Sequence, residues 1–151
     1  MNDHHWLRIA CDLAHLCPPS HAALAVGAII VSAGGEEIAR GHSREADPHE
    51  HAEEAALAKV DPRDQRLPGA TLYSSVEPCS TRRSRPVTCA ELILTSGVGR
   101  VVFAWREPPI FTECTGAEDL RAAGVTVVEI PELAEQARKP NAHLLTRPIT
   151  P

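Results

Sequence analysis

Residue types that bind metals and move protons are concentrated in the stretch PHEHAEEAAL, at positions 48–57. Glu53 follows His51 by two positions, and the chain then becomes alanine-rich, as at the start of a helix. Side chains at helix positions i and i+2 point in different directions, so one can bind a metal while the other reaches toward a substrate. The alternative is a charged helix start, where glutamate is favourable near the positive end of the helix dipole.

Two cysteines farther along the chain favour the metal site. Cys79 follows Glu77 and Pro78 at the end of an expected strand, and Cys89 begins an expected helix. One imidazole and two thiolates make a tetrahedral zinc site with the fourth position free for water, as in catalytic zinc sites. The backbone dipoles of a helix start also favour a thiolate. We therefore expect Zn²⁺ to be held by His51, Cys79 and Cys89.

The other histidines and cysteines are expected to have no such role. His49 lies two residues before His51 and could be mistaken for the ligand, but only His51 has the His-x-Glu partner. Cys11 and Cys17 lie six positions apart with no histidine at ligand spacing, so a second metal site is not expected. We expect the remaining cysteines to be small buried hydrophobic residues. These are Cys11, Cys17 and Cys114.

The composition indicates one globular domain. The chain has 151 residues, of which 43% are hydrophobic, enough to build a core without many aromatic residues. Its net charge is −5 and it has no Lys/Arg-rich run, so the sequence shows no basic patch of the kind that binds duplex nucleic acid. No apolar run approaches the ~20 residues that cross a bilayer, and the N-terminus lacks a signal-peptide core. We expect a single domain over residues 1–151, in the cytoplasm, with reduced thiols.

Hydrophobic periodicity and turn residues divide the chain into helices and strands. Leu7, Ala10 and Leu13 recur at helical spacing until Pro18 stops the helix, and Gly97 ends a later helix. A helix and a hairpin come first, and strands then alternate with helices. This order predicts a three-layer α/β/α sandwich around a mixed five-stranded sheet. The expected helices are 7–17, 51–60, 89–96, 117–123 and 132–138, before a Pro-bearing tail, and the expected strands are 25–32, 37–41, 70–77, 100–105 and 125–130.

The combination of His-x-Glu with Pro-Cys and a later Cys resembles the cytidine-deaminase-like superfamily of zinc deaminases. The resemblance implies a cytidine-deaminase-like fold and a catalytic role for Glu53. This residue would take a proton from the zinc-bound water, whose pKa zinc lowers toward ~7, and deliver it to the ring nitrogen and the leaving amine. The products would be a keto ring and ammonia. Because related deaminases form dimers or tetramers, the resemblance also implies a homo-oligomer.

The spacing of the two cysteines indicates which part of this superfamily the chain resembles most. Nine residues separate Cys79 from Cys89, where the superfamily pattern has two. This longer loop is similar to the deaminase half of the bifunctional riboflavin-biosynthesis deaminase/reductase. VGAIIV, ARGHSREADPHEHAEEAAL and LRAAGVTVVEIPELAEQARKPNAHLL are similar as well, so the resemblance runs from about Trp6 to Leu145. Because the sequence stops at Pro151, we expect a stand-alone deaminase without the reductase half.

The sequence departs from this family where substrate is bound. The family has Asn-Pro shortly before Val-Gly, and this chain has Ala23 and Leu24. Thr81 replaces a histidine two residues after the proline-linked cysteine, and ECTGAE at 113–118 replaces a segment with Gly-Lys. The resemblance therefore supports the type of reaction more strongly than it supports a particular substrate.

The loop between the two cysteines carries a dense basic patch. Arg82, Arg83 and Arg85 lie there, and arginine forks suit phosphate oxygens, so we expect Arg82 and Arg85 to bind a 5′-phosphate. The alternative is a solvated loop.

Four further residues are candidates for substrate contacts. His42 lies in the loop that approaches substrate in the family, although a solvated loop histidine is the alternative. Gly27 either lets substrate approach the backbone or eases strand packing. Phe111 lines the pocket or packs in the core, as Trp105 does, and Ala52 is the middle residue of His-Ala-Glu.

We therefore expect a zinc-dependent aminohydrolase that acts on an aminopyrimidine base, nucleoside or nucleotide. The best specific candidate is a diaminopyrimidine nucleotide of the riboflavin type. One alternative is a cytidine- or cytosine-type deaminase of another pathway. Two non-enzymatic alternatives are a zinc-braced module and a regulatory partner of a separate reductase. Glu53 argues against the zinc-braced module, because a structural zinc needs no acid/base beside it.

Overall fold

The computed structural model describes residues 2–82, 85–110 and 114–145. Its strands are β1 Gly27–Val31, β2 Glu37–His42, β3 Thr71–Val76, β4 Arg100–Trp105 and β5 Thr126–Glu129. They form one sheet in the order β2-β1-β3-β4-β5. Strand β1 pairs antiparallel with β2 and β3, whereas β3, β4 and β5 run parallel. The expected mixed five-stranded sheet is confirmed.

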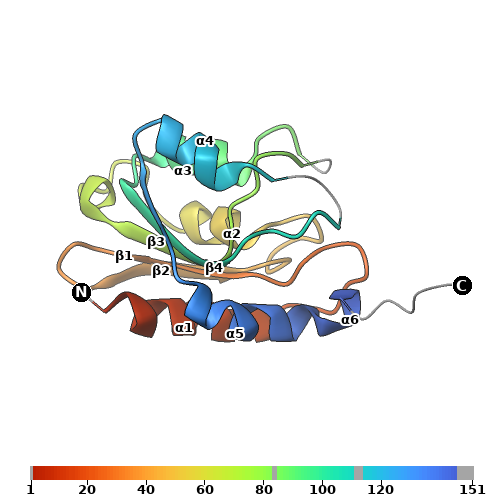
Figure 1. Ribbon diagram of the computed structural model, residues 1–151. Helices are drawn as coiled ribbons and strands as arrows, with labels where there is room; N and C mark the ends of the chain where they lie inside the picture. Colours follow the sequence, from red (N-terminus) through yellow and green to blue (C-terminus); the bar gives the residue numbers. More distant parts are fainter. Residues whose placement is uncertain (1, 83–84, 111–113, 146–151) are drawn as a thin grey trace, which may run out of the picture.

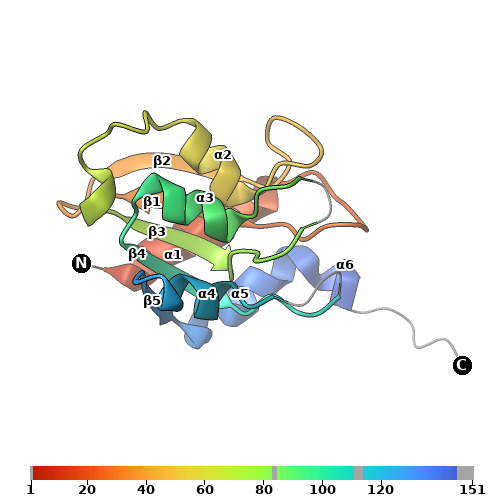
Figure 2. The ribbon, with the colours of Figure 1, turned by 90° about the horizontal axis from the view of Figure 1, so that it is seen from above.

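Helices cover both faces of the sheet (Figure 1). On one face lie α2 (Ala52–Ala58), α3 (Cys89–Ser96) and α4 (Gly116–Ala122), and on the other lie α1 (Asp3–Leu13), α5 (Ala134–Arg138) and α6 (Ala142–Leu145). Viewed from above, α2 and α3 lie next to each other over the sheet (Figure 2). The three-layer sandwich is thus confirmed. Within the described ranges, no helix is both long and apolar enough to cross a membrane. Short 3₁₀ turns occur at Ala14–Leu16, Leu67–Gly69, Pro131–Leu133 and Lys139–Asn141.

Burial of the central strands on both faces explains the three layers. All five residues of β1 are buried. Ala28 and Ile30 pack in the core beneath α2 and α3, whereas Ile29 and Val31 pack in the core against α1. Successive side chains of a strand point to opposite faces, so a continuous apolar strand requires helices on both sides.

The C-terminal tail is the main difference from the expected elements. The prediction that only a Pro-bearing tail follows residue 138 is wrong for residues 139–145, which form a 3₁₀ turn and α6. Pro140 is compatible with this because the first turn of a helix needs no N–H from it. Asn141 is fully buried, and its side chain accepts a hydrogen bond from the Ala25 amide (2.7 Å) and donates one to the Ala25 carbonyl (2.9 Å). The segment is therefore docked onto the entry to β1.

A charged cluster fastens α1 to the sheet. Arg100 donates two hydrogen bonds to the Asp3 carboxylate, at 2.9 and 2.6 Å, and the Tyr73 hydroxyl donates a third at 2.6 Å. The bonds from Arg100 lower the pKa of Asp3 to about 2. A carboxylate with three donors is worth more than an exposed ion pair.

We expect Asp3→Asn to lower the free energy of unfolding at neutral pH by about 1–2 kcal/mol. Because the pKa of Asp3 is lower in the folded state, its contribution is fully present above about pH 4 and is lost as the pH falls toward 2. Urea unfolding of the wild type and the variant from pH 7 to pH 2 measures this difference. Asp12→Asn, at an exposed position of α1, is the control. A difference that stayed constant over this pH range would contradict the assignment to Asp3.

Candidate functional site

Three side chains with metal-binding atoms converge beside the carboxyl end of β3. His51 is the N-cap of α2, Cys79 lies just beyond β3, and Cys89 is the first residue of α3. Their ligand atoms lie within 4.8 Å of one another. The structure therefore brings together all three residues that the sequence marked as zinc ligands.

The distances and the donor set fit zinc. Nδ1 of His51 lies 3.3 Å from Sγ of Cys89 and 3.6 Å from Sγ of Cys79. Tetrahedral zinc, with Zn–S of about 2.3 Å and Zn–N of about 2.1 Å, sets nitrogen and sulfur about 3.6 Å apart. Two thiolates and an imidazole are also ligands that zinc favours. Three protein ligands leave one tetrahedral position for another group.

The surroundings of Cys79 favour its thiolate form, which is the form that binds a metal. A hydrogen bond from the Cys89 thiol holds the pKa of Cys79 well below its ordinary value, and the same bond raises the pKa of Cys89. The Cys89 backbone N–H, in the first turn of α3, also donates to Sγ of Cys79 at 3.2 Å. The expected support of a thiolate by this helix start is therefore present at Cys79.

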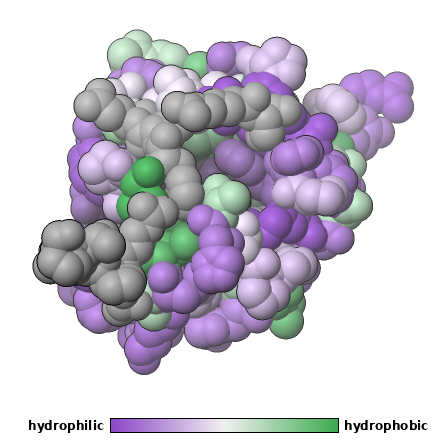
Figure 3. All heavy atoms as spheres, turned by 90° about the vertical axis from the view of Figure 1, so that its right-hand side faces the viewer, coloured by the Kyte–Doolittle hydropathy of each residue, from purple (hydrophilic) through white to green (hydrophobic). Residues whose placement is uncertain are grey.

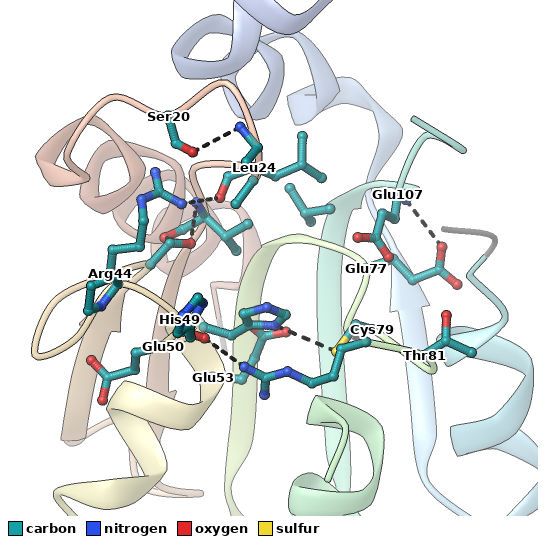
Figure 4. A pocket seen from close by; sticks show the side chains of 18 residues that line it. Ser20, Leu24, Arg44, His49, Glu50, Glu53, Glu77, Cys79, Thr81 and Glu107 are labelled. Atoms are coloured by element: carbon teal, nitrogen blue, oxygen red, sulfur yellow. Dashed lines mark hydrogen bonds between the residues drawn. The ribbon is translucent and has the colours of Figure 1, made fainter. Parts of the chain in front are cut away.

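Glu53 is buried at the edge of a cavity next to these ligands. It is 3% exposed and lines a cavity of about 390 Å³, as Cys79 does (Figure 4). Burial, followed by the nearby charge of Cys79, raises the pKa of Glu53 to about 7. A carboxyl group with a pKa near neutrality can both accept and release a proton during a reaction.

The cavity is lined by two kinds of segment. Some carry the proposed ligands, and others, such as residues 20–26, carry none. Ala23, Leu24 and Thr81, where the sequence departs from the family pattern, all line it. The loops that follow β3 and β4 lie at the right-hand side of Figure 1, the side that faces the viewer in Figure 3, and most side chains visible there are hydrophilic. The departures therefore lie where a ligand would contact the protein.

Arg44 is a pocket residue that the sequence reasoning missed. Its guanidinium donates to the carbonyls of Leu24 (3.1 Å) and Pro18 (2.7 Å), and its own amide donates to the Glu50 carbonyl at 2.7 Å (Figure 4). Its φ of 57° is unusual for a residue other than glycine, and such backbone is often found at functional sites. Arg44 thus fastens two walls of the cavity to each other.

Glu77 and Glu107 are two further missed residues that line the cavity. The Glu77 carboxylate accepts hydrogen bonds from the amides of Glu107 (3.2 Å) and Ala117 (2.9 Å), so it fixes the segment after β4. Burial raises the pKa of Glu107 to about 7, and its Oε2 has no hydrogen-bond partner among the described residues. The sequence did hold a signal, because the carboxyl ends of parallel β3 and β4 must meet at one edge of the sheet.

Three residues expected to contact a substrate lie outside the lining of this cavity. Gly27 packs under α1, and a Cβ there would come 1.9 Å from the Ala10 carbonyl oxygen, so this glycine serves strand packing. The Ala52 side chain is fully buried in the core. His42 is half-buried at the end of β2, where its Nδ1 lies 3.1 Å from the Ser43 carbonyl. None of the three is among the residues lining the cavity.

The two described arginines of the basic patch both contact Glu54. Arg82 lines the cavity, whereas Arg85 lies outside its lining and pairs with Asp47 and Glu54. Binding of a phosphate by these arginines stays a prediction. Phe111 and Arg83 lie outside the described residues.

All five cysteines are free thiols, as expected. Cys11 is 1% exposed in the core beneath α1. Cys17 and Cys114 are only partly buried, so the expectation that they are small buried hydrophobic residues is wrong for these two. Trp105 packs against the core, and the Arg138 guanidinium lies 5.9 Å from its ring centre, in agreement with the packing role.

Comparison with known proteins places this geometry in a family. Residues 1–105 match the model for the cytidine and deoxycytidylate deaminase zinc-binding region. A diaminohydroxyphosphoribosylamino-pyrimidine deaminase from Schizosaccharomyces pombe is 40% identical over 131 residues, which are 85% of this chain and 32% of that protein. The riboflavin biosynthesis protein RibD from Aquifex aeolicus is 33% identical over 145 residues, 95% of this chain and 39% of that protein. The chain thus spans about a third to two fifths of the length of these relatives.

Solved structures agree in fold. A diaminohydroxyphosphoribosylaminopyrimidine deaminase/reductase from Thermotoga maritima has a TM-score of 0.76 at 30% identity, over 96% of this chain and 42% of that one. A Rib2 deaminase from Aspergillus oryzae in complex with DARIPP has a TM-score of 0.74 at 21% identity, over 95% of this chain and 96% of that one, and so supports the fold alone. The convergence of His51, Cys79 and Cys89, the buried Glu53 and the match over residues 1–105 lead to one conclusion: the chain belongs to the cytidine and deoxycytidylate deaminase zinc-binding family.

Proposed function

We propose that the chain is a zinc-dependent hydrolytic deaminase that replaces an amino group on a pyrimidine-type ring by a keto group and releases ammonia. The observation that carries this proposal is the buried carboxyl group of Glu53, with a pKa near 7, in the same cavity wall as Cys79. A zinc that only braced the fold would need neither the cavity nor an acid/base beside it. Catalysis therefore explains more of the site than a zinc-braced module does.

In this proposal His51, Cys79 and Cys89 hold the zinc and Glu53 moves the protons. Zinc held there would supply Lewis acidity, which would make a reacting water acidic enough to attack near neutral pH. Glu53 would accept one proton from this water and pass it to the ring nitrogen. It would then take the second proton from the newly attached hydroxyl group and pass it to the leaving amine, which departs as ammonia. Water and the aminopyrimidine are consumed, and the ketopyrimidine and ammonia are formed. The low exposure of Glu53 keeps bulk water away from this exchange.

For the substrate we propose a diaminohydroxyphosphoribosylaminopyrimidine, the compound named in the relative that is 40% identical. The cavity volume of about 390 Å³ is in the usual range for small-ligand sites. Glu107 Oε2 is a buried polar atom without a hydrogen bond in the described part of the chain, and Glu107 lines the cavity. It offers a hydrogen-bonding partner for a polar group of such a ring.

A cytidine- or cytosine-type substrate is the second candidate. Ala23, Leu24 and Thr81 replace residues of the riboflavin-type pattern, and all three line the cavity. A change of contact residues at these positions favours a ring with different substituents.

Ammonia release by the purified, zinc-loaded chain tests the proposal. The substrates are diaminohydroxyphosphoribosylaminopyrimidine, cytosine, cytidine and deoxycytidylate, each at the same concentration. Release from the first supports the riboflavin-type substrate and shows that Ala23 and Thr81 are tolerated. Release only from a cytosine compound supports the second candidate. No release from any of them by folded, zinc-bearing protein would contradict the proposed activity.

Three further statements accompany the proposal. We propose that residues 1–151 form one deaminase domain, that the chain assembles as a homo-oligomer, and that it works in the cytoplasm. The single described sheet supports the first statement. Light scattering coupled to gel filtration measures the second, and a monomeric mass at micromolar concentration would contradict it.

A further inference from the structure

The Arg82 guanidinium lies where the flanks of all three proposed zinc ligands meet. Arg82 itself follows Cys79 by three positions. Its Nη2 donates to the carbonyl of His49, two residues before His51, at 2.7 Å, and its Nη1 reaches the carbonyl of Val87, two residues before Cys89, at 3.4 Å. One side chain thus connects the three segments that carry the ligands.

Glu54 completes this arrangement. Its Oε1 lies 3.3 Å from Arg82 Nη2 and accepts a hydrogen bond from the His51 backbone amide at 3.2 Å. Its Oε2 lies 3.3 Å from Arg85 Nε. Glu54 follows Glu53 directly on α2. The Glu54 carboxylate therefore contacts both the backbone at His51 and the loop between the two cysteines.

Arg82 is more deeply buried than Arg85, the other arginine that contacts Glu54. The Arg82 side chain is 2% exposed, whereas the Arg85 side chain is 34% exposed. A buried arginine held by a carboxylate and two carbonyls has little freedom to leave its place, and a planar guanidinium offers donors in several directions at once. A lysine at this position has one nitrogen and cannot reach three separate acceptors in the same way.

We infer that Arg82 is a positioning residue for the zinc site: it holds the segments flanking His51, Cys79 and Cys89 in the arrangement that zinc requires. The inference rests on the proposed zinc-dependent function and deepens it. Groups that orient metal ligands from outside commonly contribute about 10- to 100-fold to metal affinity or activity. The competing role for Arg82 is direct binding of a substrate phosphate, as its position in the basic patch suggests.

Zinc affinity of the purified full chain tests the inference, measured by competition with a chromophoric chelator. Arg82→Gln is expected to weaken zinc binding by about 10- to 100-fold and to lower kcat more than it raises KM. Arg85→Gln removes a more exposed arginine from the same Glu54 carboxylate, and is expected to change zinc affinity by less than about threefold. Arg82→Lys keeps the charge beside Glu54 but is expected to weaken zinc binding as well.

Two outcomes would overturn the inference. One is a zinc affinity of Arg82→Gln that equals that of the wild type. The other is an increase of KM for a phosphorylated substrate with unchanged zinc affinity and kcat, which would assign Arg82 to the substrate. If Arg82→Gln does not fold by circular dichroism, Arg82→Lys decides the question, and wild-type affinity in that variant overturns the inference. Failure of the wild type itself to bind zinc would instead contradict the proposed function.

Discussion

Glu53→Gln is expected to lower kcat by about a thousandfold or more while the protein keeps its zinc and its fold. Glutamine has nearly the same shape as glutamate but cannot take a proton from water or return it to the leaving amine. Glu53 is 3% exposed in a cavity beside the proposed ligands, so solvent cannot easily replace it as the proton carrier. Ammonia release measures the rate, and metal analysis measures the zinc content.

The matched control is Glu91→Gln, at an exposed position of α3. It removes one carboxylate from the surface and is expected to leave both quantities unchanged. Substantial turnover by Glu53→Gln would contradict the acid/base role. Loss of zinc from Glu53→Gln would indicate instead that the carboxylate helps to hold the metal.

Cys89→Ala is expected to weaken zinc binding by about a thousandfold and to abolish ammonia release at ordinary zinc concentrations. Binding free energies of about 10–16 kcal/mol shared among the ligands of a zinc site correspond to roughly 3–4 kcal/mol for one thiolate. Sγ of Cys89 lies 3.3 Å from Nδ1 of His51, and its loss leaves only two of the three converging ligand atoms. Zinc content after dialysis measures the effect.

Cys17→Ser controls for the loss of a thiol, because Cys17 is partly buried and lies outside the ligand group. A strong chelator gives a second comparison. It is expected to lower the melting temperature of the wild type and of Cys17→Ser, since zinc stabilises the state that binds it. It is expected to leave the melting temperature of Cys89→Ala unchanged. Full zinc occupancy of folded Cys89→Ala would contradict the proposed ligand set.

The sequence predicted those features that depend on local pattern. Strand β4 was expected at 100–105 and spans Arg100–Trp105, because a six-residue run rich in β-branched and aromatic residues favours a strand over a helix. The α3 helix ends at Gly97, whose φ of 84° is the left-handed conformation that glycine adopts readily. The proposed ligands were identifiable because the His-x-Glu and Pro-Cys patterns, followed by a later cysteine, are visible in short stretches of the sequence.

Features that depend on tertiary packing were not predictable from local pattern. Asn141 looked like part of a tail, and its burial follows from two hydrogen bonds to Ala25, more than a hundred residues earlier. Glu107 looked like a loop residue, and its place in the cavity follows from the pairing of β3 with β4. The sequence allowed two roles for Gly27, and the close contact with α1 in the structure shows that it serves packing.

Different segments of the chain supply the cavity wall and the proposed metal ligands, and this separation has an evolutionary consequence. The segment with Ala23 and Leu24 supplies part of the cavity wall but no proposed ligand, whereas the proposed ligands and Glu53 lie at the starts of α2 and α3 and just beyond β3. Substitutions in that segment can accumulate without disturbing proton transfer or metal retention. Under the proposed function, lineages that share this fold can therefore diversify in the compounds they accept while keeping one reaction. A combinatorial library restricted to residues 22–24 would explore that diversification directly.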